Sequence, residues 1–167
     1  LQWASRQPGD YGHADLDDLD RDPRPVILAS AHRRESWGVL EQIALALRDV
    51  AESNDVRIIV PLHRNPVVRE AVLPVIEKVS NITVIDPLPY LAFCRLMRRS
   101  DIILSDSSGA EEEGPALGKP TLVLREITER PEAVAAGTAR LVGRNRPRIA
   151  SEVMALLRDN ACYERMA

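Results

Sequence analysis

Short apolar runs alternate with segments of helical period along most of this 167-residue chain. Residues 26–31 form a continuous apolar run, which is typical of a strand buried on both faces of a parallel sheet. The same kind of run recurs, and the predicted strands are 26–31, 57–61, 82–85, 101–105, 121–124 and 139–142. Strands that alternate with helices indicate repeated βα units with right-handed crossovers. We therefore predict an α/β fold with a Rossmann-like, doubly wound parallel sheet of about six strands.

Helical spacing of apolar residues predicts the elements between these strands. The predicted helices are 37–52, 67–79, 90–99, a helix that opens near residue 108, and 146–158. Pro74 must kink or divide the second of them. Residues 1–24 have no apolar period, so we expect a linker or tail with at most one short helix, followed by one domain over residues 25–167.

Composition restricts the class of protein. A hydrophobic content of 45% and a charged content of 28% are ordinary for a globular domain, and the net charge of −3 argues against non-specific nucleic-acid binding. The chain has no apolar run long enough to span a membrane and no secretory signal, so we expect a cytoplasmic protein. Cys94 and Cys162 lack metal-ligand spacing, so we expect no metal site, and in a cytosolic α/β protein we expect free thiols rather than a disulfide between them.

The richest polar motif runs from Ser105 to Pro120, directly after a predicted strand. Ser107, Ser108 and Gly109 would let a ligand approach the backbone at the start of a helix, whose free N–H groups and dipole favour an anion. Three consecutive glutamates, residues 111–113, would oppose an anion unless one of them binds something else, such as ribose hydroxyls. The motif therefore predicts a nucleotide site.

Other polar residues follow neighbouring strands, and ligands bind at the carboxyl ends of the strands in such sheets. They include His32, Arg33, His63 and Arg130, and this cluster of histidines and arginines fits a substrate with two phosphates. Each signal also has an ordinary structural explanation: a hydrogen-bonded loop histidine, a core phenylalanine at Phe93, or helix-start acids favoured by the dipole alone. Neither a Gly-x-Gly-x-x-Gly fingerprint nor a P-loop occurs.

Four motifs in order carry a resemblance to a known family. They are residues 31–36, 61–66, 106–120 and 128–138. With them the chain resembles the C-terminal half of the non-hydrolysing UDP-N-acetylglucosamine 2-epimerases. The resemblance implies the C-terminal domain of a glycosyltransferase-B-type two-domain fold, with the active site in the cleft between the domains.

The resemblance also implies roles for individual residues. Phe93 would stack on uracil, Glu113 would bind the ribose hydroxyls, and His32 would be the catalytic histidine at the cleft. The diphosphate and its surroundings would be contacted by Arg33, His63, Ser107, Ser108, Gly109 and Arg130. The family usually has Ser-Gly-Gly where this chain has Ser107, Ser108 and Gly109, and a positive φ at Ser108 would cost on the order of 1 kcal/mol.

The reaction implied is reversible inversion at C2 of UDP-N-acetylglucosamine, giving UDP-N-acetylmannosamine by elimination and re-addition of UDP. The family's catalytic carboxylates lie mainly in its N-terminal domain, so residues 25–167 would be the UDP-binding domain, inactive without that partner. The resemblance implies no cofactor. It is compatible with a homodimer of the full-length protein. Two alternatives remain: the nucleotide-binding half of a glycosyltransferase-B-type glycosyltransferase, and a stand-alone nucleotide-binding module.

Overall fold

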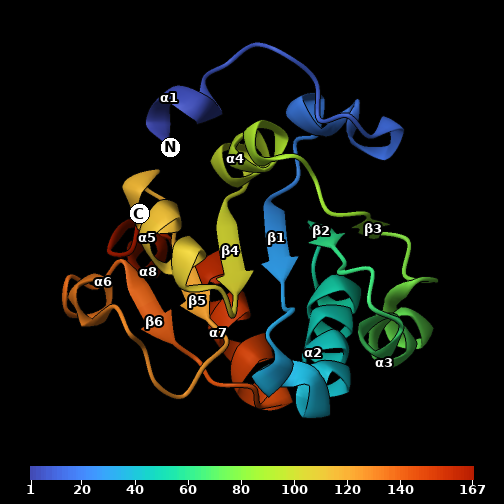
Figure 1. Ribbon diagram of the computed structural model, residues 1–167. Coiled ribbons are helices and arrows are strands. Elements are labelled where there is room, and N and C mark those ends of the chain that lie inside the picture. The colour runs from blue at the N-terminus through green and yellow to red at the C-terminus, as the bar shows by residue number, and fades with distance from the viewer.

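The computed structural model describes residues 1–167 and contains one parallel sheet in the order β3-β2-β1-β4-β5-β6 (Figure 1). The strands are β1 (Val26–Ser30), β2 (Arg57–Pro61), β3 (Ile82–Ile85), β4 (Ile102–Ser105), β5 (Thr121–Val123) and β6 (Ala139–Leu141). All five pairings are parallel. The chain moves outward from β1 in one direction and then from β4 in the other, which confirms the predicted doubly wound sheet. The switch point lies between β1 and β4.

Helices cover both faces of the sheet (Figure 1). One face is covered by α2 (Leu40–Ser53), α3 (Pro66–Ile76), α7 (Arg146–Arg158) and α8 (Asn160–Glu164). The other is covered by α4 (Tyr90–Arg99), α5 (Ser108–Ala116) and the segment that begins with α1 (Gln2–Ser5). A short α6 (Pro131–Ala135) packs beside β6.

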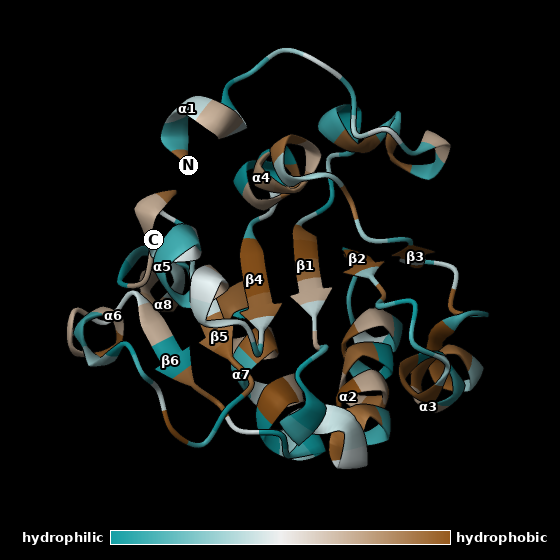
Figure 2. Ribbon diagram, viewed as in Figure 1, coloured by the Kyte–Doolittle hydropathy of each residue, from teal (hydrophilic) through white to brown (hydrophobic).

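The two cores explain why the central strands are mainly apolar. Ile27 and Ala29 belong to the core under α2, whereas Val26 and Leu28 belong to the core under α4. Successive side chains of a strand point to opposite faces, so a sheet covered on both sides favours near-continuous apolar runs rather than alternation. Figure 2 shows this as central strands, β1 and β4, that are hydrophobic for most of their length between helices of mixed character, whereas the edge strand β6 includes a hydrophilic stretch.

Two local expectations need adjustment. Helix α3 is not divided at Pro74; it continues through this residue and ends at Ile76. Pro74 lies in the last turn, and the carbonyl four residues earlier, which loses its N–H donor, belongs to the exposed Glu70 and can accept from water. The helix expected to start at Trp37 begins as a 3-10 helix, η3 (Arg34–Val39), before α2.

Residues 1–24, expected to be a linker or tail, pack on the α4 side of the sheet. They contain α1 and two 3-10 helices, η1 (Ala14–Leu16) and η2 (Leu19–Arg21). Leu16 and Leu19 are completely buried in the α4-side core. A domain boundary at residue 25 stays a prediction, but the preceding segment belongs physically to this core.

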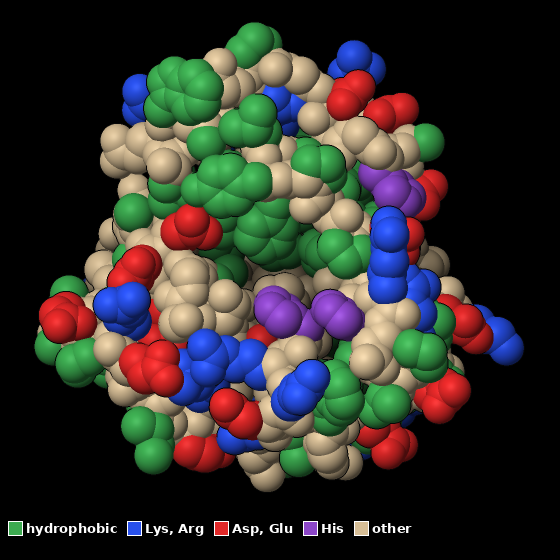
Figure 3. Space-filling view, in the orientation of Figure 1, with side chains coloured by type: hydrophobic (Ala, Val, Ile, Leu, Met, Phe, Trp, Pro, Cys, Tyr) green, Lys and Arg blue, Asp and Glu red, His purple; other side chains and the backbone are tan.

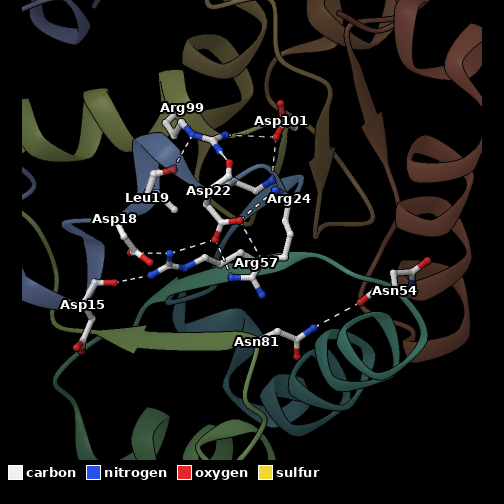
Figure 4. A network of polar contacts seen from close by, with 11 residues as sticks. Asp15, Asp18, Leu19, Asp22, Arg24, Asn54, Arg57, Asn81, Arg99 and Asp101 are labelled. Atoms are coloured by element: carbon white, nitrogen blue, oxygen red, sulfur yellow. Dashed lines mark hydrogen bonds and ion pairs between the residues drawn. The ribbon is translucent and has the colours of Figure 1, made fainter.

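A polar network holds this segment to the amino-terminal edge of the sheet (Figure 4). The buried Arg57 guanidinium donates to carboxylates of Asp18, at 2.7 Å, and Asp22, at 3.2 Å. Arg99 donates to the main-chain carbonyls of Leu19, at 3.0 Å, and Asp22, at 2.7 Å. The aspartates of this segment are therefore bound by an arginine of β2, and its main-chain carbonyls by an arginine of α4.

Two further observations bear on the sequence-based expectations. Cys94 and Cys162 are buried free thiols in the two different cores. None of the helices combines the length and the hydrophobicity that a bilayer span requires.

Candidate functional site

A cavity of about 240 Å³ opens at the carboxyl ends of the strands beside the switch point. Its walls are formed by Ser30, His32, Pro61, His63, Pro87, Leu88, Phe93, Ser105, Ser107, Ala110 and Glu113. Figure 3 shows it as a hollow in this face, with two histidines along one side and hydrophobic side chains opposite. A larger, more open depression of about 510 Å³ lies at the amino-terminal edge near Asp18 and Arg57, away from the edge where such sheets bind ligands.

The two histidines come from adjacent strands. His32 follows β1 and His63 follows β2, and their rings stack with centroids 6.3 Å apart and an interplanar angle of 14°. The Asn65 N–H donates to His63 Nδ1 at 3.1 Å, so the proton of the neutral ring is on Nε2. Asn65 also caps α3 by accepting from the Val67 N–H at 2.9 Å, which fixes this loop.

The turn after β4 presents the start of α5 to the cavity. Ser107 is the N-cap residue, with φ −82° and ψ 131°, and its side chain does not cap the helix, so N–H groups of the first turn are left for a ligand. No residue other than glycine has a positive φ. Ser108, which stands where the family usually has glycine, therefore has no backbone strain. Behind the turn, Ser105 Oγ accepts from the Ser107 N–H at 3.1 Å and lies 2.9 Å from Ser30 Oγ.

The three glutamates of α5 have three different environments. Glu111 is 1% exposed and accepts hydrogen bonds from Thr128 Oγ1 and from Arg125, the latter at 3.4 Å. Glu112 is exposed and forms an ion pair of 2.7 Å with Arg130. Glu113 lines the cavity. The helix dipole therefore does not account for Glu111, whose burial requires its own partners.

Helix α4 supplies the aromatic wall. Phe93 is partly buried and lines the cavity, one turn after the exposed Tyr90. The Tyr90 hydroxyl donates to Glu113 Oε1 at 3.3 Å. A hydrogen bond to Cys94 and the negative charge of Glu113 raise the pKa of Tyr90 to about 12, so the hydroxyl keeps its proton near neutral pH.

Most of the residues proposed from sequence converge here. His32, His63, Phe93, Ser107 and Glu113 line the cavity. Arg33, Ser108 and Gly109 do not line it but follow the lining residues His32 and Ser107 in the chain, and Arg33 Nη2 donates to Ser108 Oγ at 3.1 Å. Arg130 does not line the cavity either; it is the N-cap of α6 and pairs with Glu112.

Sequence reasoning did not single out Asp106 as a site residue. It follows β4, is 0% exposed and accepts hydrogen bonds from the loop that contains His32. A carboxylate placed directly after a buried strand and directly before the small-residue turn was the available signal. The partners that bury it come from another part of the chain, so no local pattern could identify them.

A doubly wound sheet with a helix N-terminus, an aromatic side chain and a carboxylate at its switch point places the chain in the class of Rossmann-like domains. Comparison with known proteins makes the assignment specific. The sequence model described as UDP-N-acetylglucosamine 2-epimerase matches residues 8–167, and the chain belongs to this family.

Individual relatives agree. The chain is 50% identical over 151 residues to the UDP-N-acetylglucosamine 2-epimerase of Escherichia coli K12, covering 89% of this chain and 40% of the relative. It superposes with a TM-score of 0.84 and 45% identity on the Neisseria meningitidis UDP-GlcNAc 2-epimerase bound to UDP-GlcNAc, covering 86% and 39%. S. aureus MnaA in complex with UDP gives a TM-score of 0.87 at 36% identity, covering 95% and 44%. The chain thus spans about 40% of the length of these relatives.

Proposed function

We propose that this chain is the UDP-binding part of a UDP-N-acetylglucosamine 2-epimerase, which interconverts UDP-N-acetylglucosamine and UDP-N-acetylmannosamine. The observation that carries the proposal is the cavity at the switch point, where the start of α5, Phe93, Glu113 and two histidines meet. The UDP-GlcNAc bound to the N. meningitidis relative supports the choice of ligand. The proposal includes that the full-length protein is the active form, that it is cytoplasmic and that it can form a homodimer.

The nucleoside end fits the apolar side of the cavity. Uracil would stack on Phe93 beside Leu88, because an aromatic face and an aliphatic wall suit a flat base. Glu113 would accept hydrogen bonds from the two ribose hydroxyls, exchanging its contact with the Tyr90 hydroxyl for them.

The diphosphate fits the start of α5. The N–H groups around Ser107, Ser108 and Gly109 would donate to it, with the positive end of the helix dipole behind them. Arg33 would add charge and hydrogen bonds from the loop after β1, and His63 would add a hydrogen bond from the loop after β2. Glu111 and Glu112 do not oppose this anion, because each carboxylate already faces an arginine, Arg125 or Arg130. Arg130 would reach the sugar-phosphate side only by leaving Glu112.

The chemistry would begin with loss of the proton on C2 and cleavage of the bond between C1 and the UDP oxygen, leaving a 2-acetamidoglucal. Proton delivery to the opposite face of C2 and re-addition of UDP at C1 would give the epimer. Expulsion of UDP requires its phosphates to be held and their charge stabilised, which the α5 turn and Arg33 would do. His32 would take part in proton transfer, together with carboxylates of the N-terminal domain that the family resemblance implies.

The test uses the protein that carries this chain together with the family's second domain. Incubation with UDP-N-acetylglucosamine in D₂O should yield UDP-N-acetylmannosamine with deuterium at C2, observed by proton NMR. His32→Asn should lower kcat by about 10²-fold or more, the usual contribution of an acid–base group. His13→Asn, remote from the cavity, is the matched control and should not. Transfer of the sugar to an acceptor with no epimer formed would instead identify a glycosyltransferase.

A further inference from the structure

Asp106 is a completely buried carboxylate between Ser105 and Ser107, two residues that line the cavity. No lysine or arginine pairs with it. Its hydrogen-bond donors are instead the N–H groups of His32 and Arg33 and the hydroxyl of Ser36. A buried carboxylate is costly unless several donors satisfy it, so this arrangement is a specific one.

All three donors belong to the loop that follows β1. The distances to Asp106 Oδ2 are 3.1 Å from the His32 N–H, 2.9 Å from the Arg33 N–H and 2.8 Å from Ser36 Oγ. Asp106 itself follows β4, the strand that pairs with β1 across the switch point. It therefore ties the loop of His32 to the turn that starts α5.

The second carboxylate oxygen faces the imidazole of His32. Asp106 Oδ1 lies 4.0 Å from His32 Nδ1. A carboxylate on that side favours a proton on Nδ1 in the neutral ring, and Nε2 then keeps its lone pair. The His32 side chain is 49% exposed, so the ring is accessible although its backbone is fixed.

We propose that Asp106 is the positioning residue of His32: it fixes the histidine's backbone and selects the tautomer with a proton on Nδ1 and a free lone pair on Nε2. The catalytic meaning of this arrangement rests on the proposed function. A general base must present a lone pair to the substrate in a defined place, and a positional error of about 1 Å can cost 10²-fold in rate.

The direct test measures the tautomer of His32 in the chain without ligand. Long-range proton–nitrogen correlation NMR on ¹⁵N-histidine-labelled protein, at about pH 8.5, reports which ring nitrogen carries the proton. Single His→Gln replacements of His13, His32 and His63 assign the three rings. Wild type should show His32 mainly protonated on Nδ1. Asp106→Asn should move it toward protonation on Nε2 and leave the other two rings unchanged.

The control and the contrary results are specific. Ser36→Ala removes one donor from the same carboxylate but leaves the carboxylate in place, so the His32 tautomer should stay as in wild type. A wild-type His32 protonated mainly on Nε2 would overturn the proposal, even if Asp106→Asn does not fold. So would a folded Asp106→Asn with an unchanged His32 tautomer.

Kinetics of the two-domain protein give a second, separable readout. Asp106→Asn should lower kcat by about 10²-fold with a smaller change in KM, because the carboxylate positions His32 rather than contacting the nucleotide. A rise in KM with kcat intact would contradict the positioning role. Absence of epimerase activity in wild type would refute the proposed function, whereas the tautomer result on the ligand-free chain does not depend on it.

Discussion

The Arg33 guanidinium donates a hydrogen bond of 3.1 Å to Ser108 Oγ, joining the loop after β1 to the first residue of α5. Both groups belong to the proposed diphosphate site, and they lie on opposite sides of the switch point. The serine that stands where the family usually has glycine is therefore held by an arginine from the neighbouring loop.

Removing either partner should weaken UDP binding, and the two effects should be coupled. Hydrogen bonds to charged groups contribute about 1.5–3 kcal/mol, so Ser108→Ala and Arg33→Lys should each reduce affinity roughly tenfold or more. The double variant should lose less than the sum, because contacting residues are not additive. Calorimetric titration with UDP measures all four proteins, with the exposed neighbour Arg34→Lys as the control. Strictly additive free energies would show that the contact does not matter in the bound state.

Gly109→Ala should raise the stability of the fold and at the same time weaken UDP binding. The φ of Gly109 is not positive, and an added Cβ would contact only Ser107 Oγ, at 3.5 Å. Alanine in a helix should raise the free energy of unfolding by about 0.5–1 kcal/mol in urea titrations. The same methyl group would occupy the space over the phosphate turn, so UDP affinity should fall. Unchanged affinity would mean that no phosphate approaches the helix there.

Gly114 provides the contrast within the same helix. A Cβ at this position would lie 2.1 Å from the Oγ1 atom of Thr121, a buried residue of β5. Gly114→Ala should therefore lower the free energy of unfolding by about 1–3 kcal/mol, as overpacking does.

Adjacent glutamates of α5 should differ sharply in their effect on stability. Glu111→Gln leaves the guanidinium of Arg125, which is 12% exposed, without its buried partner, and should cost on the order of 2 kcal/mol or more. Glu112→Gln breaks an exposed pair with Arg130 and should cost less than about 1 kcal/mol. Urea unfolding of the two variants measures the difference. Equal losses would refute the assignment of Glu111 as the buried partner.

The network at the amino-terminal edge should make stability depend on pH. Hydrogen bonds from Arg24, and a further one from Arg57, hold the pKa of Asp22 well below its usual range. A carboxyl group with a lowered pKa in the folded state stabilises the protein above its unfolded pKa, about 3.9, and this contribution is lost as pH falls through the folded value. Asp22→Asn should thus cost on the order of 2 kcal/mol near neutral pH, and the deficit should shrink below about pH 4.

Urea unfolding at several pH values checks this dependence. Asp17→Asn is the control on the same segment, because the Asp17 side chain is exposed and makes no ion pair. A deficit for Asp22→Asn that is constant from neutral pH down to about pH 3 would contradict the pairing.

The sequence predicted the sheet well because burial on both faces leaves a local record, such as the unbroken apolar run Val26 to Ala29 in β1. The segment before β1 leaves no such record. Leu16 and Leu19 pack against core residues far along the chain, and Arg57 and Arg99, equally distant in sequence, bind an aspartate and a backbone carbonyl beside them. Local patterns cannot show such long-range pairing.

The candidate site, like the fold, could be predicted only in part from the sequence. Residues at strand ends, such as His32 and His63, converge because the topology brings strand ends together. By contrast, the burial of Glu111 and the exposure of Glu112 are decided by the partners that fold against α5, and the sequence presents the two as equivalent. The role of Asp106 could not be predicted for the same reason, because its hydrogen-bond donors come from the loop after β1, a distant part of the sequence.

Thermal unfolding of this chain with and without UDP tests the central claim most directly. UDP at about 100 times its dissociation constant should stabilise the folded state by about 2.7 kcal/mol, a rise in Tm of roughly 5–10 °C for a domain of this size. Phe93→Ala and Glu113→Gln should lose most of this protection, whereas Trp3→Ala, an exposed aromatic outside the cavity, should keep it. No change in Tm at millimolar UDP, or full protection of the Phe93 and Glu113 variants, would contradict the proposed UDP site.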